Sequence, residues 1–138
     1  MKLIVVDGQG GGMGKAIVTQ MRKAFPESEI LAVGTNSIAT SAMMKAGATA
    51  GATGENAVVC NCANAGPEDY ILGAQGICLV DAMMGEISPA IAAAVSRSRA
   101  KKLLLPMRAC GVHVMGVAEQ PLSSYLTEMA ACVAAKAW

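Results

Sequence analysis

The stretch that decides the fold is Val6-Asp7-Gly8-Gln9-Gly10-Gly11-Gly12-Met13-Gly14-Lys15-Ala16-Ile17, residues 6–17. It ends an apolar run over residues 2–6 that lacks polar alternation, which predicts a strand buried on both faces. After it, Met13, Ile17 and Met21 recur at helical spacing until Pro26 ends the predicted helix. Five glycines therefore lie where a buried strand meets a helix. Backbone N–H groups at a helix N-terminus bind anions, helped by the helix dipole, so the stretch predicts a phosphate-binding turn.

Apolar strands and helices continue to alternate along the chain. Further strands are predicted at 30–33, 57–60, 77–80 and 102–105, with a weaker sixth strand at 112–117 at the sheet edge. Helices are predicted from Ser37 to Gly47, from Ser88-Pro89 to about Ser98, and after Pro121. This order indicates an α/β fold with a Rossmann-like, doubly wound, mainly parallel sheet of about five to six strands and helices on both faces. With 138 residues, we expect a single domain over 1–138.

The composition limits the class of partner. Charged residues make up 15% of the chain, against roughly 25% in an average domain, so we expect apolar surface to be buried in a homo-oligomer, a dimer or larger. A net charge of +1 with scattered basic residues argues against nucleic acid. The chain shows neither a long uncharged apolar stretch nor a signal-peptide pattern, so we expect no membrane partner and a cytoplasmic location. Five cysteines without metal-site spacing and one histidine predict no metal.

The spacing of the glycines separates three known turns. A mononucleotide P-loop needs glycine where Gln9 stands and a hydroxyl residue where Ala16 stands, so it does not fit. The plain Rossmann spacing, counted from Gly8, fails because Met13 occupies the third glycine position. A third spacing, glycine, three residues, glycine, one residue, glycine, is met by Gly8, Gly12 and Gly14.

With this third spacing, followed by Lys15-Ala16-Ile17, the turn resembles that of short-chain dehydrogenases/reductases. That resemblance covers about twenty residues and implies a nucleotide site. The catalytic Tyr-x-x-x-Lys of that superfamily is absent, because Ala74 lies four residues after Tyr70 and Met129 four residues after Tyr125. The resemblance therefore implies no catalytic residues here.

Five longer segments carry a second resemblance. They are Asp7-Gly8-Gln9-Gly10-Gly11-Gly12, Gly34-Thr35-Asn36-Ser37, Gly51-Ala52-Thr53-Gly54-Glu55-Asn56, Gly85-Glu86-Ile87-Ser88-Pro89 and Lys101-Lys102-Leu103-Leu104-Leu105-Pro106. Through them the chain is similar, over almost its whole length, to a small uncharacterised bacterial family, a domain of unknown function. The resemblance implies a Rossmann-like fold and supplies no activity.

NAD or NADP is the first candidate ligand, and the sequence does not choose between them. NAD sites usually place Asp or Glu after the second strand, and NADP sites place Arg near the 2′-phosphate. Here Thr35, Asn36 and Ser37 follow that strand, and they either hydrogen-bond a ribose or phosphate or cap the next helix. The candidate binding residues are Gly8, Gln9, Gly10, Gly11, Gly12, Met13, Gly14, Thr35, Asn36, Ser37 and Asn61.

The sequence thus favours a protein that binds a nucleotide or dinucleotide. The alternative is a small homo-oligomeric interaction or ligand-sensing protein whose glycine turn is structural or binds a small phosphorylated metabolite. Whether it is an enzyme stays open; an enzyme with this turn would be an NAD(P)-dependent oxidoreductase. Two residues are candidates for catalysis: Glu86 as an acid or base, and Arg108 as a partner of phosphate or carboxylate. Their alternative roles are favourable charge near a helix N-terminus for Glu86 and an exposed salt bridge for Arg108.

Overall fold

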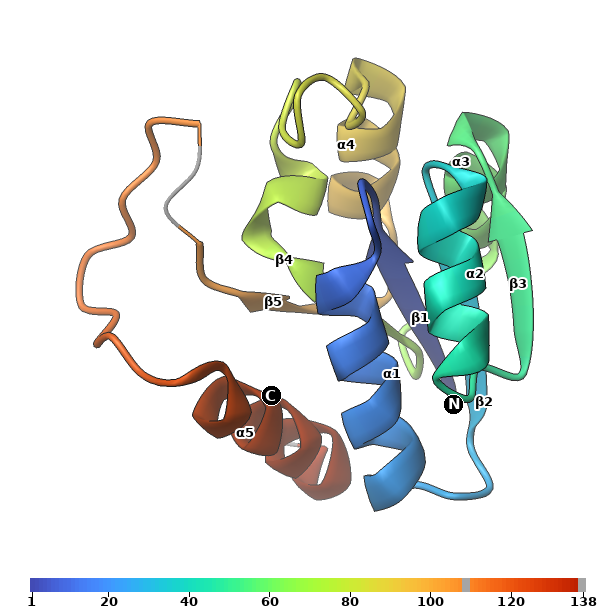
Figure 1. The fold of residues 1–138 in the computed structure, drawn as a ribbon, viewed down its shortest axis with the longest axis vertical. Helices are drawn as coiled ribbons and strands as arrows, with labels where there is room; N and C mark the ends of the chain where they lie inside the picture. The colour runs from blue at the N-terminus through green and yellow to red at the C-terminus, as the bar shows by residue number, and fades with distance from the viewer. Residues whose placement is uncertain (108–109, 137–138) are drawn as a thin grey trace.

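The structure is a computed structural model that describes residues 1–107 and 110–136. Within these ranges the strands are β1 (Lys2–Asp7), β2 (Glu29–Gly34), β3 (Ala50–Thr53), β4 (Tyr70–Ala74) and β5 (Lys101–Leu105). The helices are α1 (Gly12–Ala24), α2 (Ser37–Lys45), α3 (Glu55–Asn64), α4 (Pro89–Arg97) and α5 (Leu122–Ala135), with a short 3-10 helix, η1 (Gln75–Cys78). The strands form one parallel sheet in the order β3-β2-β1-β4-β5 (Figure 1).

β1 lies at the centre of the sheet because its side chains are apolar on both faces. Leu3, Ile4 and Val5 are fully buried, and β1 pairs with β2 on one side and with β4 on the other. Asp7, the last residue of β1, lies in register with Gly34, the last residue of β2. The two strands therefore end at the same level, beside the glycine turn.

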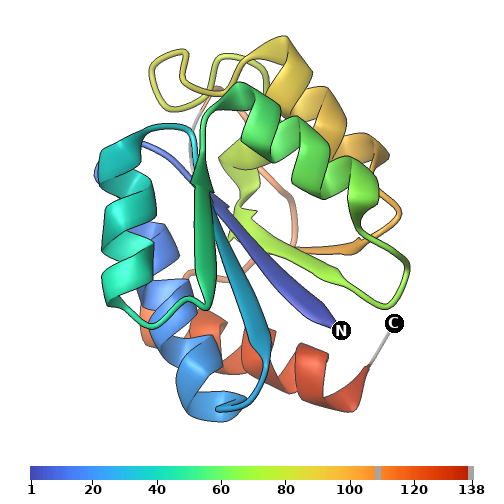
Figure 2. The ribbon, with the colours of Figure 1, turned by 90° about the vertical axis from the view of Figure 1, so that its right-hand side faces the viewer.

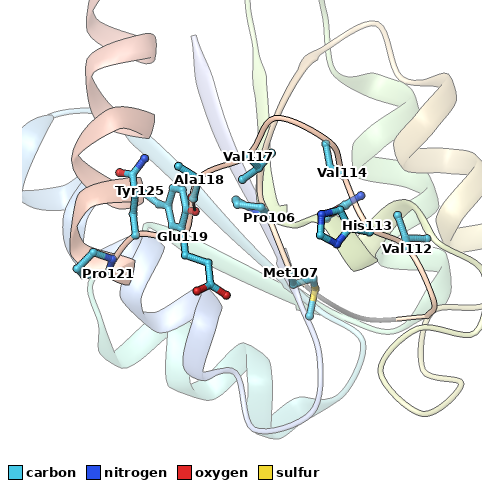
Figure 3. A pocket seen from close by; sticks show the side chains of 12 residues that line it. Pro106, Met107, Val112, His113, Val114, Val117, Ala118, Glu119, Pro121 and Tyr125 are labelled. Carbon is cyan, nitrogen blue, oxygen red and sulfur yellow. Dashed lines mark hydrogen bonds between the residues drawn. The ribbon is translucent and has the colours of Figure 1, made fainter.

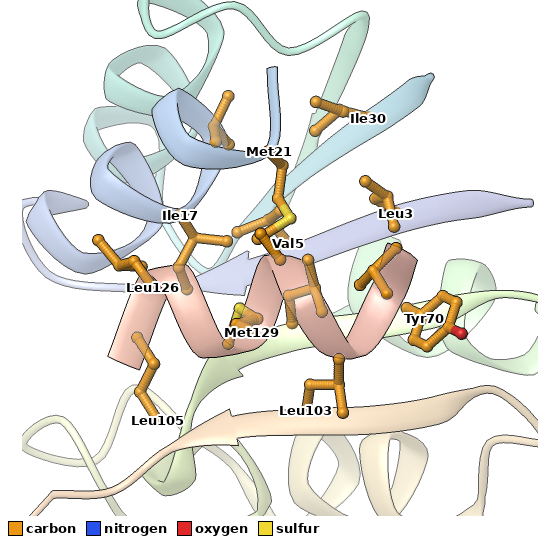
Figure 4. Close-up of a cluster of buried hydrophobic side chains, with 14 of the residues drawn as sticks. Leu3, Val5, Ile17, Met21, Ile30, Tyr70, Leu103, Leu105, Leu126 and Met129 are labelled. Carbon is orange, nitrogen blue, oxygen red and sulfur yellow. The ribbon is translucent and has the colours of Figure 1, made fainter. Parts of the chain in front are cut away.

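The helices form one layer on each face of the sheet (Figures 1 and 2). The first layer is α1, α2 and α5, while α3 and α4 pack against each other on the opposite face. Alternate residues of β1 serve the two cores: Leu3 and Val5 face α1 and α5 (Figure 4), and Ile4 and Val6 face α3 and α4. No helix in the described ranges is long and apolar enough to cross a membrane.

This architecture confirms the predicted α/β fold with a doubly wound parallel sheet, and the described residues form five strands. The predicted strand at 57–60 is wrong, because these residues belong to α3. A four-residue apolar run does not distinguish a strand from part of a buried helix. Val58 and Cys62, about one helical turn apart, are both fully buried. The strand before α3 is β3, whose residues are mostly exposed and give no apolar signal.

The predicted strand at 77–80 is misplaced as well. Residues 75–78 form η1, and the strand is β4, whose five residues are all buried. Gly73 suits this central position, because a Cβ there would lie 2.8 Å from the carbonyl oxygen of Val6. Residues 112–117, predicted as a sixth strand, instead form turns and irregular structure before α5.

Candidate functional site

The glycine turn lies where the sheet changes direction. β1 is flanked by β2, the next strand in the chain, and by β4, which the chain reaches only after completing β3. In open α/β sheets, ligands bind outside the carboxyl ends of the strands at such a switch point. The turn after β1 therefore occupies the place where this architecture usually holds a ligand.

Three of the five glycines lie where a side chain would meet neighbouring atoms. Gly11, the N-cap of α1, has a φ of 74°, and a Cβ there would lie 2.8 Å from the Cα of Ala39. A Cβ on Gly8 would lie 2.7 Å from the Thr35 hydroxyl oxygen, and one on Gly14 would lie 2.5 Å from the Met43 sulfur. These glycines let β1, α1 and α2 approach closely.

Neither packing nor backbone conformation requires glycine at positions 10 and 12. Neither has a φ in the left-handed region, and a Cβ built on either would meet nothing within 4 Å. Both residues are exposed. The N–H groups of Gly12 and Met13, the first two residues of α1, have no acceptor within the helix. At these positions the backbone is bare, and its donors are available to a ligand.

The inner side of the turn is held by the Asp7 carboxylate. Asp7 is 4% exposed and accepts hydrogen bonds from the N–H of Gly8 at 2.8 Å and of Gly14 at 2.6 Å. Burial raises the pKa of Asp7, and the nearby Glu86 adds to the rise, while these two hydrogen bonds oppose it. Asp7 thus satisfies one donor at the start of α1 and fixes the path of the turn.

The Glu86 carboxylate covers the turn from the segment that precedes α4. Its Oε1 accepts hydrogen bonds from the Gln9 N–H at 2.9 Å, the Thr35 hydroxyl at 2.7 Å and the Asn36 amide at 2.8 Å. These bonds lower the pKa of Glu86, and the bond from the Gln9 N–H has the largest effect. Burial raises the pKa, but by less than the Gln9 bond lowers it. Glu86 is therefore an ionised acceptor at neutral pH, lying over β1 and β2.

The structure brings together most of the predicted binding residues. Thr35 and Asn36 meet the glycine turn, and Asn36 also caps α2 by accepting from the Ala39 N–H at 2.9 Å. Ser37 is exposed at the start of α2 and lines an open groove with Lys15 and Lys45. Capping and contact with the turn thus coexist in the segment 35–37.

One predicted binding residue, Asn61, does not join this cluster. Asn61 lies inside α3, where its amide donates to the Ala57 carbonyl oxygen at 2.8 Å, so its placement at the end of a strand is wrong. The error follows from the misassigned strand at 57–60. Arg108 lies outside the described residues. In the ranges that the structure describes, no group of three or more His, Cys, Asp or Glu side chains could hold a metal ion.

Sequence reasoning missed a cavity of about 500 Å³ beyond the ends of β4 and β5 (Figure 3). Residues 112–114 and 117–121, which precede α5, form one wall of it. Gln75, His113 and Tyr125 supply polar atoms, and Pro106 and Val117 supply apolar surface. Only the alternation at 112–117 marked this region in the sequence, and it suggested a strand.

A comparison with known protein families shows which family this chain belongs to. Residues 2–137 match the family described as Domain of unknown function (DUF3842). The chain belongs to this family. Neither the curated proteins nor the solved structures give a significant match. The DUF3842 description assigns no activity.

Proposed function

We propose that the protein binds a nucleotide or dinucleotide at the glycine turn, with NAD or NADP as the first candidate. The open space around Gly10 and Gly12 is the observation that carries the proposal. The turn needs neither glycine for its conformation or its packing, and glycine in the interior or at the start of an element costs conformational entropy. A ligand whose phosphate approaches the backbone closely supplies the missing reason.

The donors around these glycines suit a phosphate group. The N–H groups of Gly12 and Met13 point out of the positive end of α1. Lys15 follows one position after the turn and, with Lys45, lines the adjacent groove between α1 and α2. The ammonium groups of these two lysines would attract a further phosphate of the same ligand.

A thermal melting scan tests the proposal directly. NAD, NADP, their reduced forms, ATP and AMP are each added to the folded protein. A ligand present at about 100 times its Kd stabilises the protein by roughly 2.7 kcal/mol, so the melting temperature rises. A folded protein that responds to none of these nucleotides contradicts the proposal.

Gly12→Ala separates binding from folding. The added methyl group enters open space, so the variant should fold. Alanine keeps the backbone N–H, but its methyl group occupies the space through which the phosphate would approach. The variant should therefore lose a charge-assisted contact worth roughly 1.5–3 kcal/mol, which weakens binding about tenfold or more. An interaction protein whose turn binds nothing would show unaltered assembly in this variant and no response to nucleotides.

We also propose that the chain forms a homo-oligomer. Among its large apolar side chains, Met84 is 95% exposed, Met115 83% and Ile38 69%. Together with the low share of charged residues, 15% of the chain, they favour burial of apolar surface between subunits. Sizing chromatography with light scattering at micromolar concentration tests this, and a 14.0 kDa species throughout contradicts it.

A further inference from the structure

The segment between η1 and α4 is a loop whose two ends are joined by backbone hydrogen bonds. The Asp81 N–H donates to the Ile87 carbonyl oxygen at 2.8 Å, and the Ile87 N–H donates to the Ala82 carbonyl oxygen at 3.2 Å. Ala82 and Ile87 are buried in the core beneath α3 and α4. Residues 83–86, which we call the tip, lie between these anchors. Within the tip, Met83 is half-buried and packs against this core, whereas Met84 and Gly85 are exposed.

The tip covers the crevice above Gly8. A Cβ on Gly8 would lie 3.0 Å from both the Met83 sulfur and the Glu86 Oε1. The crevice over the end of β1 is thus filled by the chain itself, in contrast to the open space at Gly10 and Gly12. A ligand that extends from these two glycines toward β4 meets the tip.

The tip is also strained. Met83 and Met84 have φ values of 56° and 57°, in the left-handed region that side chains with a Cβ rarely adopt. Met84 is 95% exposed, so no side-chain packing within its own protomer holds it there. The tip's long-range polar contacts are those of the Glu86 carboxylate with Gln9, Thr35 and Asn36. Besides these contacts, the tip is held by its own backbone bonds, from the Gly85 N–H to the Asp81 carbonyl oxygen at 3.0 Å and from the Glu86 N–H to the Met83 carbonyl oxygen at 3.2 Å.

We propose that the tip is a plug: Glu86 occupies the donors of Gln9, Thr35 and Asn36 in place of the ligand, and ligand binding displaces the tip. This inference rests on the proposed nucleotide function. A carboxylate and a phosphate compete for the same few donors and repel each other at short range. The fraction of molecules with the tip displaced then sets the apparent affinity.

Binding measurements on two variants test the plug. Glu86→Ala removes the carboxylate, and Glu86→Gln keeps an acceptor oxygen but removes the charge. Titration calorimetry with NAD, NADP and AMP at pH 7 should give a Kd for Glu86→Ala that is lower by about tenfold or more than that of the unaltered protein. Glu86→Gln should lie between them. Glu68→Gln makes the same change of charge at an exposed residue in the turn before β4 and should leave the Kd unchanged.

Hydrogen exchange on the unaltered protein supplies a readout that needs no variant. When a nucleotide displaces the tip, the peptide covering 80–87 should exchange faster, although ligands usually slow exchange at their site. Weaker binding by both Glu86 variants, with slower exchange of 80–87, overturns the plug and makes Glu86 a ligand contact. Equal affinities for all proteins also overturn it, while the nucleotide function stands. Failure of every nucleotide to bind any variant rejects the nucleotide function, and the plug with it.

Discussion

The Asp7 carboxylate accepts a hydrogen bond of 2.6 Å from the N–H of Gly14, seven residues further along the chain. This bond joins the end of β1 to the first turn of α1 and closes the glycine turn from inside. The second carboxylate oxygen accepts from the Gly8 N–H. Asp7 therefore shapes the turn from beneath, and Gly10 and Gly12 are exposed on its outer side.

Asp7→Ala should destabilise the protein because it leaves two buried N–H groups without an acceptor. Each such group costs about 1–3 kcal/mol, so we expect a loss of about 2–4 kcal/mol in the free energy of unfolding by urea. Asp7→Asn retains one acceptor and should lose less. The control, Asp81→Asn, alters an exposed residue whose φ of 66° asparagine tolerates, and should stay within about 0.5 kcal/mol. Equal stability of Asp7→Ala and the unaltered protein would contradict this role.

Gly11→Ala and Gly12→Ala should have opposite effects on stability. Gly11 has a φ of 74°, and the left-handed conformation costs alanine about 1–2 kcal/mol before its contact with Ala39 is counted. Gly12 has an ordinary φ and open space, so alanine should stabilise the fold by about 0.4–1 kcal/mol. Urea unfolding of the two neighbouring variants checks this, and equal losses would show that Gly12 also has a structural role.

Glu86 should contribute to stability in a pH-dependent way. Its pKa is lowered, so its contribution is fully present above its ordinary value of 4.5 and is lost as the pH falls through the lower value in the fold. The facing carboxyl group is that of Asp7, and burial raises its pKa. The effect of Asp7 on stability therefore has the opposite sign: the fold gains stability as the pH falls toward the ordinary value of 3.8. The difference in unfolding free energy between the unaltered protein and Glu86→Gln isolates the first effect. It should shrink from pH 5 to pH 3, and a constant difference would argue against an ionised Glu86 on the turn.

Arg22 should stabilise the end of the sheet opposite the site. Its guanidinium donates to the carbonyl oxygens of Gly47, Pro26 and Ser28 at 2.8–2.9 Å, and to the Thr49 hydroxyl at 3.0 Å. Arg22→Ala should cost about 2 kcal/mol, and lysine should not restore this loss because it lacks the planar set of donors. Lys23→Ala, at the exposed neighbouring position, should change stability by less than about 0.5 kcal/mol. Full rescue by Arg22→Lys would show that charge alone matters.

The local sequence was sufficient to predict an element where the signals for that element lie within one short segment. The apolar run of β1, the glycines and the helical spacing of Met13, Ile17 and Met21 predicted β1 and α1 correctly. Ser88 and Pro89 marked the start of α4, where the Ser88 hydroxyl accepts from the Ile91 N–H as a cap. These signals are local because caps and helical periodicity involve residues within a few positions of each other.

The same reasoning failed for short apolar runs without a local marker. Residues 57–60 are helical because Val58 and Cys62 pack together into the core beneath α4, and a contact with another element is invisible to local periodicity. β3 pairs with β2 at the edge of the sheet although its residues are small and mostly exposed. Sheet neighbours, rather than side-chain pattern, fix this strand.

By itself the sequence determined the α/β class, the glycine turn and the clustering of Thr35 and Asn36 near it, because parallel strands bring their carboxyl ends to one edge. Only the tertiary structure decided which glycines the fold needs and where Glu86 lies. The contact of Glu86 with the Gln9 N–H joins residues 77 positions apart. Such a contact depends on the packing of β1, β2 and α4 together, and no spacing within a short segment encodes it.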